Sequence, residues 1–219
     1  LPPRGGWDDW VLGWTPDGKI LVRMNRVPWC DRMGRDYVVD PEGGLETPLE
    51  LPEGGTASLS ADGRRIAYTP IDREFRTWKR ERGGRAQDVW IYDFAQKKSQ
   101  RITDDRAGDN FPMWSGDTIY FTSDRDRTLN IYAYDLGSRA TRKVTDYRDY
   151  DVLWPSLGKG GIVFMNGGHV YRLDLATRKA ARNPITFGPA MDTAAPQFKD
   201  VRSNIQGAEL SPSGTRADF

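Results

Sequence analysis

Two stretches of the sequence share one pattern and decide the fold class. Residues 13–22 read GWTPDGKILV, and residues 58–68 read SLSADGRRIAY. In each, a short apolar run is followed by an Asp-Gly turn and a second apolar run. Asp-Gly between apolar runs is a strong signal for a β-hairpin, because glycine adopts the positive φ that tight turns require. Both stretches therefore predict two-stranded antiparallel hairpins.

The same pattern recurs three more times along the chain. It is found in residues 112–121 (PMWSGDTIYF), 154–164 (WPSLGKGGIVF) and 208–216 (AELSPSGTR). The five turn glycines stand at positions 18, 63, 116, 160 and 214, so successive spacings are 45, 53, 44 and 54 residues. A recurrence at about 40 to 50 residues is typical of repeat architectures.

Each unit also has a second half. An aromatic residue is followed three positions later by aspartate in residues 37–40, 90–93, 132–135 and 171–174. A short final strand is predicted at residues 101–103, 142–145 and 184–186. Four strands per unit is the composition of a β-propeller blade. We predict an all-β propeller of four-stranded antiparallel blades, with about four blades and part of a fifth.

The repeat divides the chain into predicted blades that together form one propeller domain. They are residues 1–52, 53–104 (with a basic insert at 73–85), 105–148 and 149–187, followed by a linker and the start of a further blade at 188–219. The outer faces and edges of the end blades favour association. We therefore expect more blades in the natural protein or a homo-oligomer. A ring closed by four blades is the alternative.

Composition excludes several classes of function. The 219 residues include 32 basic and 31 acidic side chains, a balance that argues against a duplex nucleic-acid binder. No apolar run reaches the roughly 18 residues of a membrane span. Cys30 and His169 are the only residues of their types, so neither a disulfide nor a usual zinc site is expected. No Gly-x-Ser-x-Gly or phosphate-binding loop occurs, and we predict no cofactor and no metal. The start at Leu1, without methionine, suggests that the chain begins inside a longer protein.

Several segments resemble the tricorn protease family, and the repeats also resemble TolB-like propellers. The segments are residues 74–84 (EFRTWKRERGG), 87–93 (QDVWIYD), 109–114 (DNFPMW), 145–152 (TDYRDYDV) and 154–158 (WPSLG). The resemblance implies the family's six-bladed propeller within a large cytoplasmic serine peptidase. Such proteins act on oligopeptides and also carry a seven-bladed propeller, a PDZ-like domain and a protease core, assembled as hexamers.

The resemblance also implies a role for this chain. The catalytic residues of the family would lie downstream, so no residue here is expected to be catalytic. The expected function is peptide channelling or gating and the docking of domains or subunits of the peptidase. The alternative is a free-standing TolB-like propeller, a periplasmic interaction scaffold. No nucleic acid or membrane partner is expected.

The basic insert is the first candidate site. Its cationic residues are Arg76, Lys79, Arg80, Arg82 and Arg85, preceded by Arg73. Arginine binds carboxylates through two parallel hydrogen bonds, so the insert is a candidate for binding a peptide carboxylate or docking a neighbour. A solvated loop is the alternative.

The predicted channel is the second candidate site. Its walls should be the strands before each turn, in residues 11–14, 57–60, 111–114 and 152–156. Residues at one mouth are Asp8, Asp9, Asp109, Asn110, Asp149 and Asp151. Their charge can attract peptide amino termini, or the aspartates can simply cap turns. The recurring Trp14, Trp90, Trp114 and Trp154 are expected to pack between blades.

Overall fold

The computed structural model describes residues 9–25, 34–51, 53–71, 80–84, 86–185, 198–200, 202–204 and 207–218. The chain divides into two compact units, Leu1–Pro184 and Ile185–Phe219. Their described elements are almost entirely β-strands. The insert residues Arg73, Arg76, Lys79 and Arg85, together with Asp8 and Cys30, lie outside the described residues.

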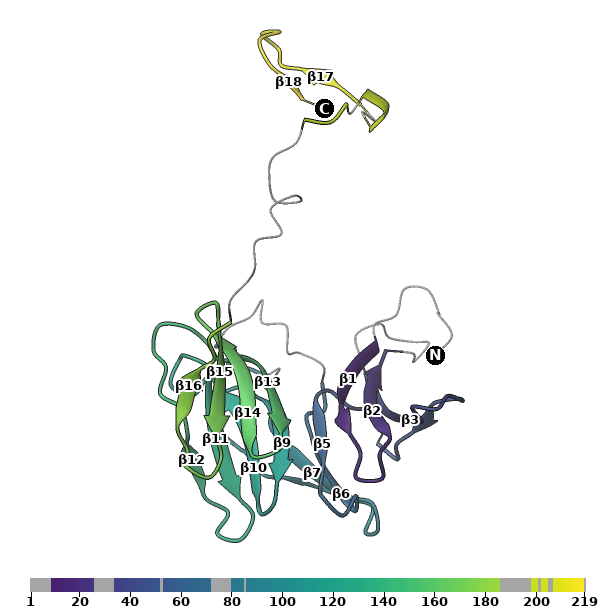
Figure 1. Cartoon of the computed structure of the whole chain (residues 1–219), viewed down its shortest axis with the longest axis vertical. Coiled ribbons are helices and arrows are strands. Elements are labelled where there is room, and N and C mark those ends of the chain that lie inside the picture. The colour runs from purple at the N-terminus through teal and green to yellow at the C-terminus, as the bar shows by residue number, and fades with distance from the viewer. Residues whose placement is uncertain are drawn as a thin grey trace. The chain divides into compact units, whose positions relative to one another are not determined.

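The first unit contains four antiparallel sheets of four strands each (Figure 1). The first blade is β1 (Asp9–Trp14), β2 (Ile20–Met24), β3 (Arg35–Val39) and β4 (Thr47–Pro48). The second is β5 (Ala57–Leu59), β6 (Arg65–Tyr68), β7 (Trp90–Asp93) and β8 (Lys98–Arg101). The third is β9 (Asp109–Ser115), β10 (Thr118–Ser123), β11 (Asn130–Asp135) and β12 (Thr141–Lys143). The fourth is β13 (Leu153–Gly158), β14 (Gly161–Asn166), β15 (His169–Asp174) and β16 (Ala180–Arg182).

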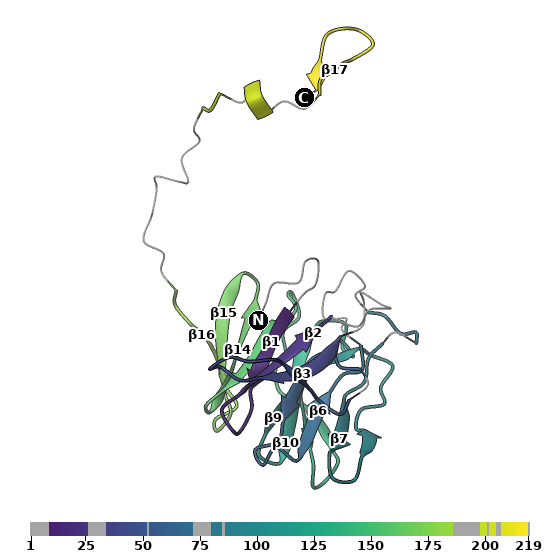
Figure 2. The same ribbon diagram turned by 90° about the vertical axis from the view of Figure 1, so that its right-hand side faces the viewer.

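Within every blade the strands follow one another in sequence order. The first strand of each blade (β1, β5, β9 and β13) contributes to the wall of one shared cavity. Figure 1 labels these four strands, and Figure 2 turns the molecule so that the first blade faces the viewer. The predicted all-β propeller with four-stranded antiparallel blades is therefore confirmed.

The hydrophobic cores lie between blades, because successive side chains of a strand point to opposite faces. Ile66 and Ala67 on β6 illustrate this. Ile66 packs with Leu21 of the first blade, whereas Ala67 packs with Phe121 of the third. A third cluster joins the third blade to Ile162 and Phe164 of the fourth. Each pair of successive blades therefore shares one core, the form of packing that repeat architectures use.

A hydroxyl side chain organises the inner turns of the first two blades. The Lys19 N–H donates to Thr15 Oγ1 at 2.8 Å, and the Arg65 N–H donates to Ser60 Oγ at 3.0 Å. Thr15 also donates to Asp17 at 2.6 Å, a hydrogen bond that is the main cause of the lowered pKa of that carboxyl. Gly18, at φ +82°, completes the turn in the left-handed region, which glycine adopts with little strain.

The second unit repeats this turn by itself. It contains a short 3₁₀ helix (Arg202–Asn204) and the hairpin of β17 (Glu209–Leu210) and β18 (Ala217–Asp218). The Arg216 N–H donates to Ser211 Oγ at 3.1 Å, and Gly214 has φ +68°. The fifth sequence repeat therefore forms a hairpin with the same local hydrogen bonding.

The fourth blade buries one face and exposes apolar side chains on the other. On β14, Ile162 and Phe164 are buried, whereas the alternating Val163 and Met165 are 42% and 40% exposed. Leu153, which pairs with Met165, is exposed as well. A blade with both neighbours present would cover this face.

Candidate functional site

The inner strands surround a central channel with a volume of about 600 Å³. Its wall consists of residues 10–14, 56–59, 111–114 and 154–157, one stretch from each blade. The predicted channel strands are therefore confirmed in all four blades. Ser60, Val152 and Leu153, at the ends of two predicted stretches, lie outside this wall. Val152 is buried in the core between the third and fourth blades.

Two channel strands carry an aromatic residue in a left-handed conformation. Phe111 has φ 54° and Trp154 has φ 52°, and each precedes a proline. Strand pairing is interrupted at both positions by a bulge. A positive φ costs a non-glycine residue about 1 kcal/mol or more, so these two positions of the channel wall carry local backbone strain.

Hydroxyl groups of the second blade accept the backbone donors of the third. The Phe111 N–H donates to Thr56 Oγ1 at 3.1 Å, and the Trp114 N–H donates to Ser58 Oγ at 3.0 Å. These bonds join two inner strands that share no backbone ladder among the described strands. Side-chain hydroxyls thus hold the blades together at the channel.

Aromatic rings gather where the first, third and fourth blades meet. Trp10 and Trp154 stack with ring centroids 5.6 Å apart, and Phe111 meets Trp154 edge-on at 6.2 Å. The Arg23 guanidinium lies 5.4 Å from the centre of the Trp10 ring. The channel therefore offers a broad aromatic surface.

The prediction that four tryptophans pack between blades is only partly correct. Trp114 is buried in the core between the second and third blades, and Trp90 is half-buried. Trp14 is 70% exposed and Trp154 is 39% exposed, and both line the channel. For Trp14 the prediction was wrong, because its strand position turns the side chain toward the open channel. Trp154 also lines the channel, but it stacks on Trp10 of the first blade and so packs between blades as predicted.

Asp109 and Asn110 are buried, which corrects their predicted place at the channel mouth. The Arg125 guanidinium donates to both carboxylate oxygens of Asp109, at 3.1 and 3.3 Å. Burial raises the pKa of Asp109 to about 6, against the lowering effects of Ser123 and Arg125. Asn110 accepts a hydrogen bond from Gln87 at 2.9 Å. Both residues pair with β10 inside the sheet, which encloses their side chains.

The remaining acidic residues differ in their surroundings. Asp9 and Asp149 are exposed. Asp151 is half-buried, and its carboxylate accepts the Leu129 N–H at 2.9 Å. Attraction of a peptide amino terminus therefore stays a prediction for Asp9, Asp149 and Asp151. The turn-capping role stays the alternative.

The described end of the basic insert is bound to the third blade. Arg82 donates to a carboxylate oxygen of Asp124 at 2.8 Å and to its backbone carbonyl at 2.9 Å. The Arg80 N–H donates to the other carboxylate oxygen at 3.1 Å. Asp124 is 1% exposed. Sequence reasoning missed this partner, and only its position in the run TSDRD (residues 122–126) hinted at a turn.

Neither metal ligands nor a membrane-spanning helix are found in the described part of the chain. No group of three or more histidine, cysteine or acidic residues gathers there. No described helix has the length and apolar character needed to cross a bilayer. His169 is exposed at the start of β15.

Comparison with known proteins agrees with this architecture. Residues 4–179 match the family model described as the tricorn protease N-terminal beta propeller domain. The chain belongs to this family. It is 31% identical over 172 residues to the tricorn protease of Thermoplasma acidophilum, covering 77% of this chain and 16% of that protein. Tricorn protease homolog 1 of Streptomyces coelicolor is 27% identical over 166 residues, covering 75% and 15%.

Solved structures give the same result for this tricorn-type propeller. The crystal structure of the tricorn protease matches with a TM-score of 0.71 at 26% identity, over 83% of this chain and 18% of that one. TolB from Acinetobacter baumannii matches with a TM-score of 0.62 at 21% identity, over 80% and 43%, and shares the fold. The chain spans less than a fifth of the length of the curated relatives described above.

Proposed function

We propose that this tricorn-type propeller is a non-catalytic part of a cytoplasmic serine peptidase, in which its central channel passes or gates oligopeptides. The channel itself is the observation that carries the proposal. Its volume of about 600 Å³ lies within the range of ligand-binding cavities, about 300 to 1,000 Å³. Family membership supplies the peptidase context.

The chemistry of the wall suits an extended peptide. The rings of Trp10, Phe111 and Trp154 offer flat apolar surfaces for side chains of varied sequence. The exposed Ser156 hydroxyl can bond peptide backbone groups. Asp9 and Asp149 add negative charge that attracts a peptide amino terminus. Such a lining binds peptides of many sequences weakly, which movement of a peptide through the channel requires.

Docking of other domains or subunits is the second part of the proposal. Arg80 and Arg82 are already bound within the chain, so Arg76, Lys79 and Arg85 are the insert residues proposed for partners. The exposed Val163 and Met165 provide an apolar surface suited to association. A homo-oligomer is therefore part of the proposal, and light scattering on a size-exclusion column tests it directly. A monomer near 24.8 kDa would argue against it.

The alternative function is a free-standing scaffold of the TolB type, which shares the propeller fold. A scaffold would bind a folded protein partner on its surface and would need no peptide in its channel. Peptide binding in the channel therefore separates the two functions.

The test uses fluorescence anisotropy with labelled oligopeptides of six to ten residues. An extended peptide spans about 3.3 Å per residue. We expect binding that weakens about tenfold in Trp154→Ala, since stacking area on the wall is lost. Leu45→Ala, at a site 78% exposed outside the channel, serves as the control. Absence of binding, or equal binding by Trp154→Ala and the unaltered chain, would reject the channel. The same samples should hydrolyse no peptide.

A further inference from the structure

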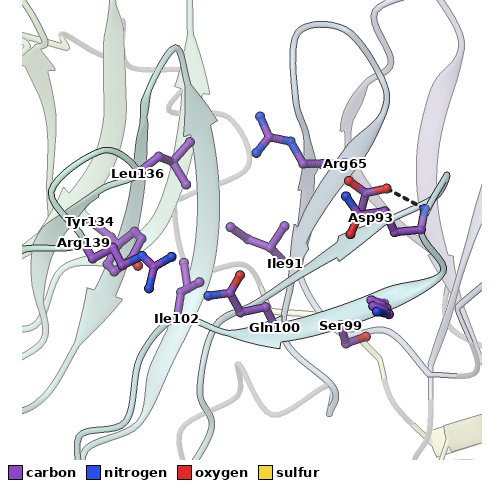
Figure 3. A pocket seen from close by; sticks show the side chains of 11 residues that line it. Arg65, Ile91, Asp93, Ser99, Gln100, Ile102, Tyr134, Leu136 and Arg139 are labelled. Carbon is purple, nitrogen blue, oxygen red and sulfur yellow. Dashed lines mark hydrogen bonds between the residues drawn. The ribbon is translucent and has the colours of Figure 1, made fainter.

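A second cavity lies away from the channel, between the second and third blades. Its volume is about 380 Å³. The second blade contributes Arg65, Lys98 and Gln100 to its wall, and the third contributes Leu136 and Arg139. Figure 3 shows Arg65 and Gln100 on one wall and Leu136 and Arg139 on the other, with Ile91 and Ile102 between them.

Strand register explains why these residues share one face. Arg65 lies opposite Asp93, and Asp93 lies opposite Lys98, so the three form a row across β6, β7 and β8. Two residues along the strands, on the same face of the sheet, Ile91 lies opposite Gln100. Both rows face the third blade. Ile91 belongs to the core shared by these blades, which makes the cavity floor apolar.

The wall carries more positive than negative charge. Arg65, Lys98 and Arg139 are basic, and Asp93 is the one carboxylate. Asp93 Oδ1 accepts hydrogen bonds from the N–H groups of Ala95 and Gln96, at 3.0 and 2.8 Å, so this oxygen is engaged by its own turn. Within the described part of the chain, no ion pair involves any of the three basic side chains.

Contacts on opposite walls position the side chain of Arg65 and the backbone of Arg139. The Arg65 guanidinium lies 5.0 Å from the centre of the Trp114 ring, which fixes its plane. Arg139 stands in a left-handed turn at φ 58°, with its N–H bonded to the Asp135 carbonyl at 2.8 Å. In Figure 3 Arg139 and Gln100 point toward one another from the third and second blades.

We propose that this cleft binds an organic carboxylate that carries an apolar group. The carboxylate pairs with Arg139 and Arg65, because guanidinium groups match carboxylates in shape and charge. The Gln100 amide donates a further hydrogen bond. The apolar group lies on Ile91 and Ile102. The volume fits a molecule the size of one or two amino-acid residues, about the lower end of ligand cavities. This site is separate from the channel and independent of its function.

The fourth blade supplies a matched control for Arg139. Arg178 has the same φ of 58°, and its N–H bonds the Asp174 carbonyl at the same 2.8 Å. The two arginines therefore occupy equivalent turns, yet Arg178 lies outside the wall of this cleft. Replacing either one changes the charge of the chain equally, so only a specific site distinguishes Arg139→Gln from Arg178→Gln.

The test is a titration of the 219-residue chain, followed by amide NMR shifts. The probes are N-acetyl-leucine, its uncharged amide N-acetyl-leucinamide, and inorganic phosphate. We expect N-acetyl-leucine to shift amides of residues 96–100 and 136–139, and the other two probes to bind about tenfold more weakly. Arg65→Gln and Arg139→Gln should each weaken N-acetyl-leucine about tenfold, with Arg178→Gln unchanged.

Three outcomes would overturn the proposal. They are no shift at these amides, equal binding of phosphate or of the leucinamide, or equal weakening by Arg178→Gln. The comparison of probes needs only the unaltered chain, so it remains decisive where a variant fails to fold. A tripeptide ending in leucine then shows which kind of molecule supplies the carboxylate. Tighter binding than N-acetyl-leucine indicates a peptide carboxyl terminus, and weaker binding indicates a small free acid.

Discussion

Trp10 of the first blade stacks on Trp154 of the fourth, with ring centroids 5.6 Å apart and planes inclined by 24°. In the described strands no backbone ladder joins β1 to β13. The first and fourth blades therefore meet at the channel through side chains. The stacked indole pair contributes to this junction.

The first prediction concerns this pair. Trp154→Ala should lower the free energy of unfolding by about 2 kcal/mol, less than a fully buried tryptophan, because the ring is 39% exposed. Urea unfolding measures the loss, and near-ultraviolet circular dichroism should lose the signal of coupled indoles. Trp14→Ala, 70% exposed, is the control and should change stability by less than about 0.5 kcal/mol. Equal losses of unfolding free energy in both variants would show that the stacking of Trp154 on Trp10 does not stabilise the chain.

The second prediction concerns the buried pair of Asp109 and Arg125. Burial raises the pKa of Asp109 to about 6 in the folded chain, above the 3.8 of an ordinary aspartate. The folded state therefore holds this proton more tightly than the unfolded state does. Stability from this group is fully present below about pH 4 and is lost as the pH rises to about 6. A pKa difference of about two units between the folded and unfolded states corresponds to about 3 kcal/mol of stability.

Asp109→Asn tests this directly, because asparagine stays neutral at every pH. Relative to the unaltered chain, the variant should gain stability by up to about 3 kcal/mol between pH 4 and pH 7, measured by urea unfolding. Asp62→Asn should show the opposite sign, since the Ser60 hydroxyl and the Arg64 N–H lower the pKa of Asp62. A stability difference that is independent of pH would contradict the raised pKa of Asp109.

The third prediction concerns Arg82 and Asp124. Arg82→Ala removes a cationic partner of a carboxylate that is only 2% exposed, so we expect a loss of about 2 kcal/mol. Adding Asp124→Asn removes the buried charge and should restore about half of that loss. Thermal unfolding of the single and double variants measures both effects. Arg106→Ala, at an exposed arginine in the same region, is the control. No recovery in the double variant would mean that charge is not the cause.

The fourth prediction compares two serines at equivalent positions. Ser58 Oγ accepts the Trp114 N–H of the next blade, whereas Ser156 is exposed. Ser58→Ala should destabilise the chain by about 1 kcal/mol, because a half-buried donor loses its acceptor. Ser156→Ala should change stability by less than about 0.5 kcal/mol. Denaturant unfolding of both variants provides the measurement, and equal effects would argue against hydroxyl bonding between blades.

Local features of this fold were predictable from the sequence, and contacts between blades were not. The Thr15 and Ser60 turns depend on residues within five positions, so the sequence pattern contains all that forms them. Arg82 and Asp124 are 42 positions apart, and no pattern links them. Asp109 was expected at an exposed mouth, and its burial follows from β10 and the neighbouring blade. Trp14 looked like a packing residue because hydrophobicity alone does not show which face of a strand meets an open channel.

The aromatic junction also sets an order of events in folding. Hairpins such as Thr15–Lys19 join residues four positions apart, so each can form in about 1 to 10 microseconds. Trp10 belongs to the first blade and Trp154 to the fourth, so they are far apart in the sequence. Bringing them together therefore costs the most loop-closure entropy. We expect blades to form one after another and this junction to close last. Slow refolding phases should therefore respond to Trp154→Ala, and fast phases should not.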